Sequence, residues 1–275
     1  QSSVCTGDQI THDSSTIQVE NIDHLGSSNL KLADKTLLSL YNSITVPQQK
    51  SMAVTGEDGE LVIRGTLTFE NASQLVLNSA DSQIRGSFDF KDSNVVDAQE
   101  DVNIKSSISK WNNSQIKVTA GKTLKFSENE WYTKGTLTKT GGSMSLENME
   151  WTLSGDTSYT SDTEIKIKTL LLNDHILALG SADSDITVTD NMTFNNSNEA
   201  LKTGLADITL ENSISLEDGA ITSTGGIVYF EKGGIQSGGE LDVTDSTIKL
   251  GDDFSKSGGA LTTTEDGTKL ELTDN

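Results

Sequence analysis

The decapeptide "LVLNSADSQI" occupies residues 75–84, and a near copy of it, "LALGSADSDI", occupies residues 177–186. Seven of the ten positions are identical, and the two copies begin 102 residues apart (177 − 75). That separation is too long for one hairpin, but it equals about five repeats of about 20 residues. The pair therefore predicts a repeat architecture. Its Ser-Ala-Asp-Ser element is expected to form a turn, because Ser and Asp side chains bond to nearby backbone amides.

Apolar residues that recur along the chain define the length of the repeat. A first series, made of apolar pairs with one polar residue between them, has a mean step of 21 residues ((270 − 102)/8). It starts at Val102, Leu124, Met144, Ile165, Ile186, Ile208, Val228, Ile248 and Leu270. A second series comprises Leu67, Phe88, Ile108, Trp131, Trp151, Leu170, Met192, Ile214, Ile235 and Phe254. A third comprises Leu75, Val95, Ile116, Leu137, Tyr159, Leu177, Leu201, Ile221, Leu241 and Leu261.

Three interleaved series with one common step predict an all-β fold. The expected form is a parallel β-solenoid with three short strands per rung of about 21 residues, and about ten rungs. Stacked rungs share a narrow core, which accounts for a hydrophobic content of only 33%. Connections between parallel strands are overwhelmingly right-handed, so a right-handed coil is expected. The competing architecture is an antiparallel sandwich of short strands, which gives no reason for a shared step.

The repeat covers residues 61–275, which we expect to form the β-helix, whereas residues 1–60 follow it poorly. Within the latter, "LADKTLLSLYNSI" (32–44) places apolar residues, among them Leu37 and Tyr41, at helical spacing. Residues 1–60 are therefore expected to form one of two structures. The first is a cap, with an amphipathic helix over the open strand edge of the first rung. The second is a set of irregular early rungs.

The charge and composition exclude some partners and compartments. The chain carries 41 acidic and 20 basic side chains, a formal charge of −21, and this surface repels nucleic acid. No apolar run approaches the about 20 residues needed to span a bilayer, so no membrane insertion is expected. Cys5 is the only cysteine, which rules out an internal disulfide. The start at Gln1 fits removal of a signal peptide, and an extracellular or cell-surface location is expected.

Trp111, Trp131 and Trp151 are the candidate binding residues, because steps of 20 and 20 residues stack them in one column. If the column faces outward, it forms a flat strip on which sugar rings could lie. If it faces inward, it forms a buried aromatic ladder. The alternation from Met149 to Leu153 puts Trp151 on the core side, which favours the ladder.

Residues that could bind a metal are sparse. His12, His24 and His175 are scattered, and no His or Cys cluster has the spacing of a zinc site. Asp183 and Asp185 could offer oxygen ligands to calcium at a corner, and solvated turn carboxylates are the simpler interpretation of the same residues. No cofactor is therefore expected, with calcium as the alternative.

The architecture of residues 60–275 resembles the right-handed parallel β-helix proteins, which include pectate-lyase-like enzymes, phage tailspikes and passenger domains of secreted bacterial adhesins. In the pectin-cleaving members, the resemblance implies an Asn-Thr-Asp, Asp-Asp or Gly-His-Gly element, or Arg and Lys beside calcium-binding Asp. This chain has one Asp-Asp, Asp252–Asp253, and its only arginines are Arg64 and Arg85. The segments "SGGALT" (257–262) and "FSEN" (126–129) resemble the Gly-Gly-Ala-aliphatic and Phe-x-x-Asn repeats of chlamydial-type surface autotransporters.

These features predict a non-enzymatic extracellular structural protein, either an adhesin stalk or a subunit that joins head to tail into fibres. The segment "TKLELTDN" (268–275) carries Leu270 and Leu272 on a last strand, the expected assembly edge. The expected partners are other copies of the chain, or glycans or proteins of a cell surface. The alternatives are a glycan-binding module that uses the Trp column and a polysaccharide-degrading β-helix enzyme.

Overall fold

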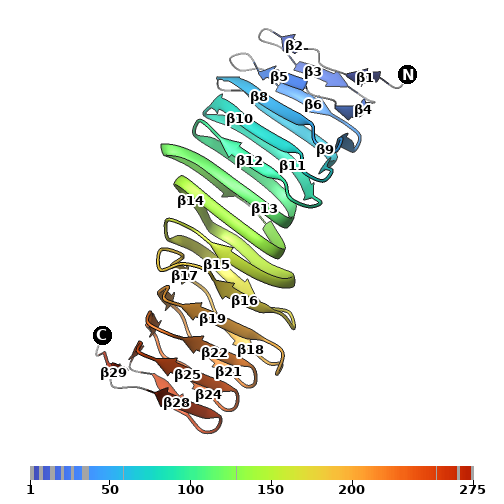
Figure 1. The fold of residues 1–275 in the computed structure, drawn as a ribbon. Coiled ribbons are helices and arrows are strands. Elements are labelled where there is room, and N and C mark those ends of the chain that lie inside the picture. The colour runs from blue at the N-terminus through green and yellow to red at the C-terminus, as the bar shows by residue number, and fades with distance from the viewer. Residues whose placement is uncertain are drawn as a thin grey trace. The chain divides into compact units, whose positions relative to one another are not determined.

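A computed structural model gives the fold (Figure 1). It describes the backbone of residues 3–5, 9–12, 16–19, 22–25, 28–32, 37–57, 59–127, 129–251, 253–264 and 267–273. Side chains are described for residues 37–56, 59–105, 108–127, 130–251, 253–264 and 267–273.

The protein is an all-β parallel solenoid of about 11 turns, and the described residues contain no helix. This confirms the fold class expected from the repeat. The chain divides into two compact units, one of residues 1–132 and 137–146 and the other of residues 133–136 and 147–275. Figure 1 shows the strands of each unit stacked side by side. Accordingly, the described part of the chain offers no helix long and apolar enough to cross a membrane.

The strands of the first unit follow each other in a fixed order of three. The first eight are β1 (Ser3–Cys5), β2 (Gln9–His12), β3 (Thr16–Val19), β4 (Ile22–Leu25), β5 (Ser28–Leu32), β6 (Leu37–Leu40), β7 (Ile44–Val46) and β8 (Ser51–Glu57). The next are β9 (Glu60–Phe69), β10 (Gln74–Ala80), β11 (Ser82–Phe90), β12 (Val95–Ala98) and β13 (Val102–Ser127). β1 pairs with β4, β2 with β5 and β3 with β6, all in parallel, so three strands make one turn.

The strands of the second unit keep the same order. β14 (Asn129–Thr160) contributes to both units. The remaining strands of the first series are β15 (Ile165–Leu171), β17 (Ile186–Val188), β20 (Ile208–Leu210), β23 (Ile227–Phe230), β26 (Thr247–Leu250) and β29 (Lys269–Leu272). The second series, a separate four-stranded sheet, is β18 (Met192–Phe194), β21 (Ile214–Leu216), β24 (Gly234–Gln236) and β27 (Phe254–Lys256). The third is β16 (Ile176–Leu179), β19 (Ala200–Gly204), β22 (Ala220–Ser223), β25 (Glu240–Thr244) and β28 (Ala260–Thr264).

The register of the second unit confirms the first apolar series residue by residue. The paired inward positions are Ile165, Ile186, Ile208, Val228, Ile248 and Leu270, each facing the next. All of these side chains except that of Leu270 are buried. Because every rung covers the apolar residues of its neighbour, the core is continuous through these six rungs.

Four members of the other two series are corrected by the register. Ser109, not Ile108, pairs with Phe88, and Ile108 points outward with 38% of its surface exposed. Val96, not Val95, pairs with Leu75. Tyr159 pairs with Leu179, while Leu177 faces Thr157.

In the fourth case the inward residue is a glycine. Gly234, not Ile235, pairs with Ile214, and Ile235 is 54% exposed. A Cβ at Gly234 would lie 2.3 Å from the side chain of Ile214, so the core has no room for a side chain there. A search for apolar residues passes over such a position and selects its neighbour.

The helix expected in residues 32–44 is wrong for the described part of that stretch. Leu37–Leu40 forms β6, which pairs in parallel with both β3 and β9. Leu38 and Leu40 are buried at a spacing of two, the period of a strand. Tertiary pairing on both edges therefore overrides the helical spacing. Ala33 lies outside the described residues. The division of the chain at residue 60 stays a prediction.

The two copies of the decapeptide form the same corner. The hydroxyls of Ser79 and Ser82 bond to each other in the first copy. Those of Ser181 and Ser184 do so in the second, at 2.7 Å. Each corner also accepts a backbone amide of the preceding rung, since Gly59 N donates to Ser82 Oγ (3.2 Å) and Ser161 N to Ser184 Oγ (2.9 Å). The repeated serines therefore join rungs at a turn, as the sequence predicts.

We expect Ile208→Asp to destabilise the protein strongly, because it places an unpaired carboxylate between Ile186 and Val228. The loss should be about 3 kcal/mol or more, measured as the free energy of unfolding in urea. Thr209→Asp, one position along and pointing outward, is the matched control, and its cost should be below about 1 kcal/mol. Equal losses in the two variants would contradict the register.

We also expect Gly141→Ala to cost more than Gly121→Ala. Both glycines have positive φ (87° and 79°), so both substitutions carry a conformational cost of about 1 kcal/mol. Only at Gly141 would the new Cβ meet an atom, the backbone oxygen of Val118 at 1.9 Å, whereas nothing lies within 4 Å at Gly121. The clash should add a further ~1–3 kcal/mol to the unfolding free energy lost at Gly141. Similar midpoints of urea unfolding would contradict the close packing of this corner.

Candidate functional site

The three tryptophans are buried, which corrects the interpretation of them as an outward sugar-binding strip. Trp111 is 2% exposed, and Trp131 and Trp151 are 0% exposed. In the first unit, the ring of Trp111 packs on Phe90 (4.3 Å between centroids) and meets Trp131 edge-on (6.4 Å). In the second unit, Trp151 meets Tyr159 edge-on at 5.3 Å.

The indole nitrogens of Trp111 and Trp151 also form hydrogen bonds inside the core. Trp111 Nε1 donates to Ser109 Oγ (2.5 Å), and Trp151 Nε1 donates to Thr133 Oγ1 (2.7 Å). Indoles that are buried and hydrogen-bonded in this way stabilise the stack of rungs, as the aromatic-ladder interpretation expects.

Asp183 and Asp185 lie at one corner, but they differ in environment. Asp183 is exposed, whereas Asp185 is half-buried and its Oδ1 accepts the backbone amide of Asp207 (2.7 Å). Burial raises the pKa of Asp185, and the negative charges of Asp207, Glu164 and Asp183 raise it further, while the bond from Asp207 N opposes the rise. The Asp185 carboxylate thus holds the next rung in place.

The described residues contain no group of three or more His, Cys, Asp or Glu side chains that could hold a metal ion. His175 lies beside Asp156 (3.7 Å between Nδ1 and Oδ1). The side chains of Cys5, His12 and His24 lie outside the described residues.

The other residues singled out in the sequence are far less enclosed. Leu270 and Leu272, the expected assembly edge, are 53% and 78% exposed in β29, which pairs with β26. Asp253 is exposed, and Asp252 lies outside the described residues. Arg64 lies over the ring of Tyr41 at 4.9 Å.

Arg85 forms an ion pair with Glu60, with 2.7 Å between Arg85 Nε and Glu60 Oε1. Each arginine thus has a structural contact of its own.

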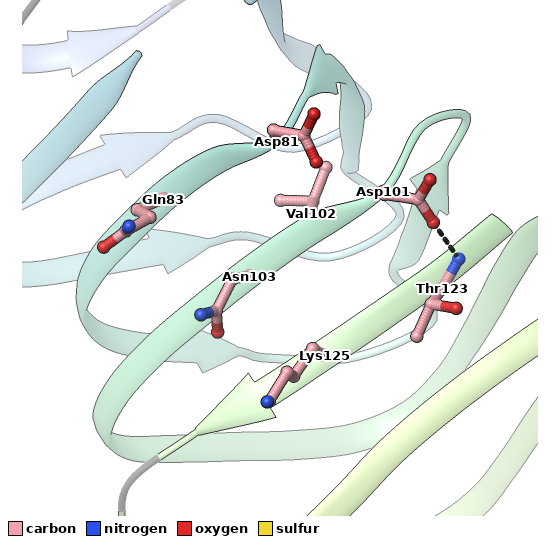
Figure 2. A pocket seen from close by; sticks show the side chains of 7 residues that line it. All are labelled: Asp81, Gln83, Asp101, Val102, Asn103, Thr123 and Lys125. Atoms are coloured by element: carbon pink, nitrogen blue, oxygen red, sulfur yellow. Dashed lines mark hydrogen bonds between the residues drawn. The ribbon is translucent and has the colours of Figure 1, made fainter. Parts of the chain in front are cut away.

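A pocket that the sequence analysis missed lies on the outward face of β11 and β13 in the first unit (Figure 2). It is open on one side and has a volume of about 260 Å³. It is lined by Asp81, Gln83, Asp101, Val102, Asn103, Thr123 and Lys125.

These residues come from the same place in three successive rungs. The segments are "DSQ" (81–83), "DVN" (101–103) and "TLK" (123–125), each with a polar residue on both sides of its central position. Gln83 pairs with Asn103, so the two amides lie one above the other. Asp81 N donates to Asp101 O (2.9 Å), and Thr123 N donates to Asp101 Oδ1 (2.7 Å). The sequence indicates the pocket only through these repeated polar positions, which the spacing of apolar residues does not reveal.

Carboxylates outnumber ammonium groups around the pocket. Lys122 forms an ion pair with Glu100 and lies 3.8 Å from Asp101 Oδ2. The hydrogen bond to Glu100 and the negative charges of Glu100, Asp101 and Asp81 raise the pKa of Lys122. With Lys125 on the rim, two ammonium groups lie near the pocket, against the three carboxylates of Asp81, Glu100 and Asp101.

Comparison of the chain with protein families, with curated proteins and with solved structures finds no match.

We expect Asp185→Asn to raise the melting temperature at neutral pH. Asn keeps an oxygen that can accept the Asp207 amide, but it removes a partly buried charge from beside Glu164 and Asp207. Because the folded-state pKa of Asp185 is raised, the ionised group disfavours folding above that pKa and has no such effect below its ordinary value of 3.8. The difference between variant and wild type should thus vanish as the pH falls through this range.

Asp183→Asn at the exposed neighbour serves as the control for that measurement, and its effect on the melting temperature should be smaller. A melting temperature that drops in Asp185→Asn at pH 7 would show that the charge itself is needed for the corner.

Proposed function

We propose that this chain is a non-enzymatic structural protein of the cell exterior, a β-solenoid that serves as an adhesin stalk or as a fibre subunit. The observation that carries the proposal is the column of paired inward residues from Ile165 to Ile248, continued by Leu270. Each rung stacks on the next in register, so length is gained by adding rungs and requires no new core.

The hydrogen bonds support a mechanical role. Parallel strands bond to the rungs on either side, so the bonds run along the direction in which the rungs stack. A pull along that direction is shared by all the bonds that join two rungs. Corner bonds between side chain and backbone, such as Ser161 N to Ser184 Oγ and Asp207 N to Asp185 Oδ1, add to them.

We further propose that the solenoid is right-handed and belongs to the parallel β-helix superfamily. The general handedness of parallel crossovers supports the first point, and the three-strand turn of 20 to 22 residues supports the second. The Trp column no longer supports a glycan-binding role, because its rings are buried.

End-to-end association is the proposed mode of assembly in the fibre form. Leu270 and Leu272 mark where another rung would pack on β29, whether that rung belongs to the same chain or to a second molecule. The negative charge of −21 opposes association side by side and so favours growth along the stacking direction.

The test is sedimentation velocity and negative-stain imaging of the full chain over a range of concentrations. We expect elongated particles that lengthen with concentration, and no lengthening in the double variant Leu270→Asp, Leu272→Asp. The matched control is Ser255→Asp with Ser257→Asp, which adds two carboxylates at the same spacing on exposed positions in and just after β27.

Two outcomes would count against the proposal. Compact globular particles would exclude a stalk or a fibre, whereas elongated monomers at every concentration would exclude only the end-to-end mode. Release of reducing ends from polysaccharides, abolished by Asp253→Asn, would instead favour the enzyme.

A further inference from the structure

We infer that the pocket on β11 and β13 is a binding site for a neutral saccharide. The inference goes beyond the proposed structural role and does not depend on it. Figure 2 shows the side chains of three successive rungs gathered around one hollow, with the Asp101–Thr123 bond beside it. Its volume of about 260 Å³ lies just below the about 300–1,000 Å³ common for small-molecule sites, so it suits a ligand group the size of a single sugar ring.

The pocket has a row of hydrogen-bond acceptors on one side. Asp81 and Asp101 occupy corresponding positions in adjacent rungs, and the Thr123 hydroxyl follows in the next rung. The Asp101 carboxylate accepts one backbone amide through Oδ1, and its remaining lone pairs can accept hydroxyl groups of a ligand.

A row of donors lies beside the acceptors. Ser127 Oγ donates to Asn103 Oδ1 (2.8 Å), and Arg85 Nη2 donates weakly to Gln83 Oε1 (3.4 Å). Both amides use their carbonyl oxygens in these bonds, so their NH₂ groups are the atoms left to serve a ligand. Lys125 extends the row by one rung, from an exposed position.

Parallel rows of acceptors and donors suit a molecule that carries several hydroxyl groups. Each sugar hydroxyl can donate to the carboxylate row and accept from the amide row, because a hydroxyl does both. Rungs are about 4.8 Å apart, which is wider than the spacing of hydroxyls on adjacent carbons, so hydroxyls on alternate carbons of a ring meet equivalent partners in successive rungs. Val102 also lines the pocket, but only 3% of its surface is exposed, so the contacts open to a ligand are mainly the polar ones.

The charges select a neutral ligand. The chain carries a charge of −21, and Asp81 and Asp101 line the pocket itself, so an acidic saccharide is repelled. A metal cation would compete with Lys122, which lies 3.8 Å from Asp101. An uncharged polyhydroxylated ligand avoids both penalties.

The experiment is saturation-transfer NMR of the full chain with cellotetraose, maltotetraose, mannotetraose and, as the acidic counterpart, tetragalacturonate. We expect at least one neutral probe to bind with a Kd on the order of 1 mM, as befits a shallow site with few hydrogen bonds. Asn103→Ala and Gln83→Ala should each weaken that binding by about 3- to 10-fold. Gln115→Ala, an outward amide of β13 on another face, should leave the affinity unchanged.

Lys125→Ala provides a second variant at an exposed position, where the fold is not at risk, and it should weaken binding as well. The inference is overturned if no neutral probe binds up to about 20 mM. It is equally overturned if the pocket variants bind as wild type does, if tetragalacturonate binds as tightly, or if EDTA abolishes binding. Sedimentation tests the structural role separately, so the two proposals can fail independently.

Discussion

Every part of this fold depends on the register between one rung and the next. A strand in a parallel solenoid has both edges occupied, so shifting it by one residue would turn all its inward side chains to the surface. The column from Ile165 to Ile248 shows the constraint at work, since each member is held by partners above and below. Because the narrow core holds only the inward side chains of the stacked strands, no second layer of side chains could compensate for a strand that shifts by one residue.

The corners must hold that register where the regular pairing bends. Three kinds of residue do so here. Serine hydroxyls accept amides of the neighbouring rung, as at Ser82 and Ser184. Aspartates do the same at Asp101 and Asp185. Glycines such as Gly141 occupy positions where a Cβ would collide with a backbone carbonyl of the neighbouring rung.

A lysine that donates to two glycine carbonyls fixes the bend within a single turn. Lys139 Nζ donates to Gly141 O (2.9 Å) and to Gly142 O, from a side chain that is 1% exposed. Lys256 Nζ donates to Gly259 O (2.6 Å) and to Gly258 O in the same way. The segments "KTGG" (139–142) and "KSGG" (256–259) are thus one structural solution used twice. The Gly-Gly pair in "SGGALT" follows from this corner chemistry, which needs no relationship to surface autotransporters.

The fold could be predicted from the sequence because the apolar spacing of about 21 residues recurs in rung after rung. The first series could be read correctly, since in each rung the inward residue is large and apolar. The errors at Ile108 and Ile235 arose where the inward residue is Ser109 or Gly234, which carry no hydrophobic signal. The predicted helix was wrong because local spacing of apolar residues carries no information about partners far along the chain. Pairing with β3 and β9 makes Leu37–Leu40 a strand. The burial of the Trp column could be favoured from the neighbours of Trp151, but the packing that fixes it comes from other rungs.

Outward side chains do not have to pack in the core. A binding site can therefore be gained or lost at these positions with little effect on stability. On some faces the outward side chains bond to each other across rungs. Thr244 and Thr264 share a hydrogen bond (2.6 Å), and Lys166 reaches Glu211 two rungs away (2.5 Å). Such ladders consume the polar groups that a ligand would need.

The face that carries Gln83 and Asn103 is different, because these two amides do not bond to each other. Their carbonyl oxygens accept from Arg85 and Ser127, so their NH₂ groups remain able to donate to a ligand. A solenoid therefore acquires a polar binding surface where the outward side chains of a column are not bonded to each other, and it closes that surface where they are. The sequence could not disclose the pocket by itself, because only the register decides which residues share a column.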